Sequence, residues 1–344
     1  YVLVHHPHLL PSFAGLSNAQ KESIRFTQCK MDYNMGWLVQ AEAPPGALFR
    51  TMRKMASGQV EATMEERDIA FYFVHWFCDL AAAEPCPLNG MDKFVLKFPI
   101  RVLGQFIASF GVVQTLSKSK TETMVLEDYL VERWHQHEPF LGAVPKGPGA
   151  IARARLVLMA QGDSAKVLRA FAELPAEDRA ALSEEMAITG LRGQSFLRDS
   201  LAGSEAADKG PAVLVYYSPA LMQRAGREDP SKAMRILADL YRAARQMWPL
   251  SADAADATVT VRIDALKDLE CSAIFHPDAG RCWVLHKTSG QDAHVERLTP
   301  AALKEVDWDS HVCLHFGNAN AEAHKPLSRP RFRHGSKESG ARTG

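Results

Sequence analysis

The stretch Ala212-Val-Leu-Val-Tyr-Tyr217 marks the point at which the sequence changes its pattern. Before it, apolar residues recur at helical spacing, whereas this short apolar run is typical of a β-strand. Three more strand-like runs follow at residues 257–263, 281–285 and 311–316, and a helix is predicted over residues 230–247. The pattern predicts a mainly α protein with a C-terminal α+β domain: a helical bundle followed by a small mixed sheet with helices.

The part of the chain before residue 205 is predicted to be all helical. The predicted helices cover residues 18–39, 47–56, 64–83, 94–110, 121–134, 150–160, 164–172 and 176–189, the first with Ser17-Asn18 as its N-cap. The centre of the 64–83 helix is apolar nearly all round, which is typical of a buried helix. The 121–134 helix carries Glu122, Glu127 and Asp128 on its predicted polar side.

The length of 344 residues favours two domains. We place an all-α domain at 1–205 and an α+β domain at 211–320, separated by the small, polar residues 202–211; the Pro/Gly-rich residues 142–149 are interpreted as a loop within the first. Residues 323–344 carry six basic residues and one glutamate, a net charge of +5. With little that could enter a core, this basic tail is predicted to be disordered.

Composition excludes several classes of protein. The balance of 40 Lys+Arg against 40 Asp+Glu argues against a globally basic nucleic-acid binder and leaves such a contact only to the basic tail. No apolar run reaches the ~18–20 residues of a membrane span. The six scattered cysteines contain no C-x-x-C pair, and no signal-peptide pattern is visible, so we expect an intracellular, reducing compartment.

Two groups of residues near the start could hold a metal. Val4-His5-His6-Pro7-His8 places three imidazoles within four residues, although it also fits a polar loop. His75 and Asp79 are four residues apart and therefore share a helical face. A carboxylate in such an apolar helix needs a basic partner, a helix N-terminus or a metal, unless Asp79 caps the turn that follows.

Taken together, the histidine-rich element and Asp79-Leu-Ala-Ala-Ala83 resemble the HD-domain metal-dependent phosphohydrolases over residues 1–140. The resemblance implies an all-α domain that holds a divalent metal (Mn, Fe, Ni or Zn). It also implies water activation for attack on a small phosphorylated substrate such as a nucleotide or another phosphoester. His5, His6 or His8 would match metal-binding histidines and Asp79 the final metal-binding aspartate, with His75 as a further candidate ligand.

The chain departs from that family in one respect, because no His-Asp dipeptide occurs in it. A relative without this pair would not hydrolyse phosphoesters. The alternative function is therefore a non-catalytic helical regulatory or scaffold protein, which binds a protein partner within a larger assembly.

A third candidate lies in His311-Val-Cys-Leu-His315. On a strand, His311, Cys313 and His315 share one face, which suits zinc, copper or a cysteine nucleophile beside an imidazole base. Same-face neighbours lie ~6.5–7 Å apart, too far for one ion to bind all three, and half-buried strands also accept His and Cys without function. His276, His286 and His294 would join them only through the fold.

Overall fold

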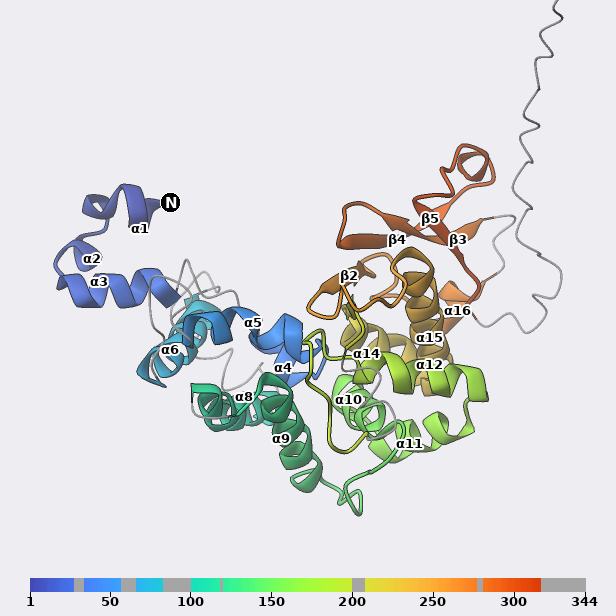
Figure 1. Cartoon of the computed structure of the whole chain (residues 1–344), viewed down its shortest axis with the longest axis horizontal. Coiled ribbons are helices and arrows are strands. Elements are labelled where there is room, and N and C mark those ends of the chain that lie inside the picture. Colours follow the sequence, from blue (N-terminus) through green and yellow to red (C-terminus); the bar gives the residue numbers. More distant parts are fainter. Residues whose placement is uncertain are drawn as a thin grey trace, which may run out of the picture.

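The computed structural model describes residues 1–27, 34–56, 66–82, 100–117, 120–199, 208–276 and 281–316. Helices make up most of the described chain, and a five-stranded sheet forms near its C-terminal end (Figure 1). The predicted fold class, mainly α with a C-terminal α+β part, is confirmed. The predicted disordered tail at 323–344 lies outside the described residues.

Short and medium-length helices make up the part before the sheet. They are α1 (Val2–His5), η1 (Pro7–Leu9), α2 (Pro11–Ala14), α3 (Asn18–Arg25), α4 (Met35–Val39), α5 (Pro45–Ala56), α6 (Glu66–Ala82), α8 (Ile100–Gln114), η4 (Thr115–Ser117), α9 (Glu122–His135), α10 (Ala150–Ala160), α11 (Ser164–Glu173) and α12 (Ala176–Ala187).

The helix predicted over residues 18–39 begins as expected but does not continue to its end. Ser17 forms a capping box with Gln20 at the start of α3. Asn34 has extended backbone, and its side chain accepts a hydrogen bond from the Gly36 N–H, so α4 begins anew there. The second part of the prediction is therefore wrong because a second N-cap was overlooked.

Two helices differ from the predicted burial of their side chains. In α6, Phe73 belongs to the core, but Val74 is 58% exposed, so this helix is not buried all round. In α9, Glu122 and Glu127 are buried rather than on a solvated face. Glu122 accepts a hydrogen bond from Arg53, and Glu127 accepts from two backbone N–H groups of the 197–198 segment, which provides the partners that buried carboxylates need.

The C-terminal part contains a mixed sheet whose apolar face is covered by a long helix. Its elements are β1 (Ala212–Tyr216), α14 (Ser218–Glu228), α15 (Pro230–Met247), β2 (Thr258–Arg262), α16 (Cys271–Ile274), β3 (Cys282–Lys287), β4 (Asp292–Leu298), η5 (Ala302–Lys304) and β5 (His311–Leu314). The strand order is β1-β2-β4-β3-β5. The β1–β2 and β2–β4 pairs are parallel, while β3 is antiparallel to both β4 and β5.

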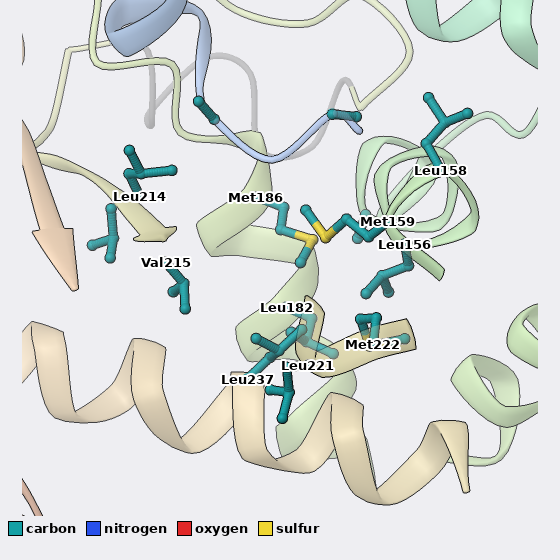
Figure 2. Packing of buried hydrophobic residues seen from close by; sticks show 14 of the residues in the cluster. Leu156, Leu158, Met159, Leu182, Met186, Leu214, Val215, Leu221, Met222 and Leu237 are labelled. Carbon is teal, nitrogen blue, oxygen red and sulfur yellow. The ribbon is translucent and has the colours of Figure 1, made fainter. Parts of the chain in front are cut away.

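The apolar face of the sheet packs against α15, which contacts β1, β3 and β5. α15 also packs on α12, and α10 packs on α14, so helices from both sides of residue 205 meet in one hydrophobic cluster. Figure 2 shows side chains of α10, α12, β1, α14 and α15 meeting in it, among them Met159, Met186 and Met222. The domain boundary at residue 205 stays a prediction, and the two parts share this core.

A buried arginine connects the loop before α5 to the rest of the core. Arg155 of α10 donates hydrogen bonds to the carbonyls of Ala41 (2.8 Å), Met186 (3.0 Å) and Glu42. The Glu42 carboxylate in turn accepts from the Tyr217 N–H, immediately before α14. Ala41 and Tyr217 both have positive φ angles, +51° and +77°, a conformation that these neighbouring contacts must hold in place.

The structure describes the state of four cysteines and the hydropathy of the helices. The four cysteines whose side chains are described, Cys78, Cys271, Cys282 and Cys313, are free thiols. Within the described ranges, no helix combines the length and the hydropathy that crossing a bilayer requires.

Candidate metal centre

Three adjacent strands bring together three side chains of the types that can bind a metal. His286 on β3 lies directly opposite His311 on β5, and on its other side it lies opposite His294 on β4. Glu296 is two residues beyond His294 on the same strand. Because paired residues and alternate residues of a strand share a face, His286, Glu296 and His311 all project from the face of the sheet opposite α15.

The three side chains converge on one point. Glu296 Oε1 lies 3.3 Å from His286 Nδ1 and 3.5 Å from His311 Nε2. One candidate ligand atom from each of the three lies within 4.8 Å of the other two. Zn–ligand bonds of about 2.0–2.1 Å place tetrahedral ligands about 3.3 Å apart, whereas neighbouring ligands of an octahedral ion lie about 3.0 Å apart. The separations of Glu296 Oε1 from the two histidine nitrogens are close to this spacing.

A backbone contact orients the His311 ring. His311 Nδ1 lies 2.8 Å from the Asp307 carbonyl oxygen, and its side chain is only 12% exposed. Since a carbonyl can only accept, a hydrogen bond here requires the hydrogen on Nδ1, which leaves Nε2 as the ring nitrogen on the Glu296 side. This is the arrangement that metal-binding histidines usually show, with the second ring nitrogen held by a carbonyl or carboxylate.

His286 is held in its neutral form by its surroundings. Burial lowers the pKa of His286, and the nearby His311 and His294 lower it further, while Glu296 acts in the opposite direction. Its ring stacks on that of His311, with centroids 4.0 Å apart and planes 9° from parallel. A neutral imidazole is the form that binds a metal through a lone pair in its ring plane, so the stacked rings would have to tilt from parallel for both to bind one ion.

His294 lies beside this group without belonging to it. Its Nε2 is 4.0 Å from the other carboxylate oxygen of Glu296, and its ring meets His286 edge to face at 5.0 Å. The side chains of His294, His286 and Glu296 are 40%, 32% and 32% exposed, so solvent and small ligands can reach this face of the sheet.

The sequence prediction for residues 311–315 is only partly confirmed. His311 and Cys313 share the expected face, and Leu314 is buried on the other. Burial and the neighbouring Cys282 raise the pKa of Cys313, which disfavours the thiolate that a nucleophile needs. His315 is exposed and lies beyond the end of β5.

The N-terminal ligands predicted from the sequence do not belong to this centre. His5 and His8 are exposed in α1 and η1, and His6 lies between these two helices with its ring 6.0 Å from that of His8. His75 lies in α6, and its buried Nδ1 has no hydrogen-bond partner among the described residues. Asp79 also lies in α6, but its side chain is outside the part of the chain that the structure describes. Their role as metal ligands stays a prediction.

Glu296 and the position of His294 were missed because β4 was not predicted. The signal was present: in Asp292-Ala-His-Val-Glu-Arg-Leu298, Ala293 and Val295 alternate with His294 and Glu296. Ala293 and Val295 face the core, and the other phase of the strand carries His294 and Glu296. This alternation of apolar and polar residues is the pattern of a half-buried strand.

No protein-family model, curated protein or solved structure matches this chain.

Proposed function

We propose that the chain is a metal-dependent hydrolase whose divalent metal, zinc by preference, is bound by His286, Glu296 and His311. The observation that carries the proposal is the convergence of two imidazole nitrogens on one carboxylate oxygen at 3.3 and 3.5 Å. Two histidines and one glutamate form a ligand set of catalytic zinc sites, in which water occupies the fourth position. The partial exposure of this sheet face leaves that position open to substrate.

The residues around the centre would have separate roles in catalysis. The metal would lower the pKa of its water to about 7 and so supply a nucleophile near neutral pH. The Asp307 carbonyl would keep His311 in the tautomer that binds through Nε2. His294, on the solvent-exposed flank of Glu296, is the group placed to exchange protons with a ligand at the centre.

Metal content tests the proposal directly. We expect the purified chain to hold about one equivalent of zinc by elemental analysis, and His311→Ala or Glu296→Gln to lose it. His315→Ala is the matched control, because it removes an exposed histidine four residues from His311 without touching the centre. Less than about a tenth of an equivalent in the wild type, or full retention in His311→Ala, would exclude this centre.

A second candidate function is the HD-like phosphohydrolase with its metal in the N-terminal helical part, bound by His5, His6, His8, His75 or Asp79. The observation in its favour is the buried Nδ1 of His75, which has no hydrogen-bond partner among the described residues. Metal that survives His311→Ala and is lost in His75→Ala and Asp79→Ala would support this candidate. A chain that binds no metal would favour the regulatory or scaffold protein with a protein partner.

A further inference from the structure

A serine and a histidine outside the metal centre form a close hydrogen-bonded pair. Ser164 is the first residue of α11, and its Oγ lies 2.6 Å from Nε2 of His137, which follows the end of α9. The Gly162 carbonyl oxygen, 3.5 Å from the same Oγ, is the more distant acceptor. Ser164 and His137 are only 4% and 7% exposed, so little water competes for the hydroxyl hydrogen. The Ser164 hydroxyl is therefore directed toward an imidazole nitrogen.

A backbone carbonyl orients the His137 ring. His137 Nδ1 lies 2.8 Å from the Pro139 carbonyl oxygen, and a hydrogen bond between them requires the hydrogen on Nδ1. Nε2 then keeps the lone pair that accepts from the Ser164 hydroxyl. A nucleophile within hydrogen-bond reach of a base, with the base oriented by a third group, is the arrangement that activates a serine for covalent catalysis.

The first turn of α11 places backbone donors beside the serine. Asp163, the N-cap, accepts hydrogen bonds from the N–H groups of Lys166 and Val167, each at 3.0 Å. Within the described part of the chain, the N–H groups of Ser164 and Ala165 have no acceptor. Free N–H groups at the start of a helix favour negative charge. They suit the oxygen that becomes negative when a serine attacks an acyl group.

The Ser164–His137 pair lies between two exposed segments of the chain. Gly162, Asp163 and Ala165 are exposed in one segment, and Pro139 and Phe140 are exposed in the other, Phe140 to 73%. A substrate has to displace side chains of these segments to reach the buried hydroxyl, and a small acyl group displaces the fewest. The burial of the pair therefore favours esters of short acids over large acyl substrates.

We propose that Ser164 is the nucleophile and His137 the general base of an acyl-transfer site for small esters, separate from the metal centre. His137 Nε2 takes the proton of the Ser164 hydroxyl as Oγ bonds to the acyl carbon. The C–O bond of the ester then breaks, and the alcohol leaves with that proton. A water molecule, deprotonated in turn by His137, hydrolyses the acyl-serine, which releases the acid and restores the hydroxyl.

Methanesulfonyl fluoride tests the nucleophile, because Oγ displaces its fluoride and the sulfonyl ester that forms is stable. We expect the full chain, treated with a chelator present, to carry the label in the tryptic peptide 156–166, in which Ser164 is the only residue with a hydroxyl side chain. His137→Gln should take up this label about 100-fold more slowly, the size of a general-base effect. Ser164→Ala should lose both the label in this peptide and the hydrolysis of 4-nitrophenyl acetate that the wild type shows.

Ser218 provides the matched control. It is also buried and also the first residue of a helix, α14, but its Oγ lies 3.8 Å from the sulfur of Met159 instead of an imidazole nitrogen. We expect Ser218→Ala to be labelled at Ser164 at the wild-type rate, and Ser218 of the wild type to stay unlabelled.

The outcomes do not depend on the metal, because the chelator removes it. A wild type without the label at Ser164, or one that hydrolyses 4-nitrophenyl acetate no faster than Ser164→Ala, would overturn the proposal. Equal labelling rates in the wild type and His137→Gln would overturn it too, because the pair would then only join α9 to α11. If circular dichroism shows that a variant is unfolded, the wild type decides alone: a label at Ser164 and none at Ser218 supports the site, and any other distribution overturns it.

Discussion

Replacement of Glu42 by glutamine tests how the buried loop before α5 is stabilised. Burial raises the pKa of Glu42 from 4.5 to about 7, against the Tyr217 N–H and Arg155, which lower it. The pKa of Glu42 is higher in the folded state than in the unfolded state, so its protonated form stabilises the fold. This contribution to the free energy of unfolding is fully present below pH 4.5 and is lost as the pH rises through 7. Each unit of pKa corresponds to about 1.4 kcal/mol, so the carboxylate lowers the free energy of unfolding by about 3 kcal/mol at pH 8.

Glutamine keeps the acceptor for the Tyr217 N–H and removes the charge. We therefore expect Glu42→Gln to resemble the wild type at pH 5 and to be more stable by about 3 kcal/mol at pH 8. Urea unfolding at the two pH values measures this difference, and Glu184→Gln on the exposed face of α12 serves as the control. If Glu42→Gln is less stable than the wild type at pH 8, the carboxylate acts as a required counter-ion of Arg155 and our reasoning is wrong.

Three further predictions concern burial, backbone conformation and the metal centre. Arg155→Met leaves three buried carbonyls without donors, and we expect urea unfolding to show a loss of about 3–5 kcal/mol. Gly149 has φ +75°, and a Cβ at this position would lie 2.6 Å from Ser183 Oγ, whereas Gly193 has φ +71° and open space around it. Thermal unfolding should therefore show that Gly149→Ala destabilises the protein clearly more than Gly193→Ala. Metal binding requires a neutral His286, and the pKa of this group is lowered from 6.5. Dialysed protein should therefore retain zinc at pH 7 and release it only well below pH 6.5; retention in strong acid would contradict the proposed ligands.

The fold class could be predicted because its signals are local. The strands at β1, β2, β3 and β5 and the helix α15 were predicted because alternation or helical periodicity is visible within each segment. α14 was missed because it starts directly after β1, at Tyr217-Ser-Pro219, where no loop separates strand from helix. The burial of Glu122 and Glu127 could not be predicted, since their partners, Arg53 and the 197–198 backbone, are about 70 residues away in the chain.

The candidate metal centre could not be predicted from the sequence for the same reason. His311 was singled out on its own strand, but its partners His286 and Glu296 depend on the order β4-β3-β5. Sequence reasoning gave no pairing register, and a shift of one residue would have turned His286 to the opposite face. The N-terminal histidines His5, His6 and His8 are close in sequence, but closeness in sequence does not place three ligand atoms around one point in space.

The hydrogen bond between Glu42 and the Tyr217 N–H has a consequence for biosynthesis. The two residues are 175 positions apart, and Arg155 must also be in place between them. At a synthesis rate of about 5–20 residues per second, the loop before α5 waits roughly 10–35 seconds for its partner to be made. The helical N-terminal half of a nascent chain therefore lacks these contacts, and the part of its core that they close, during that time.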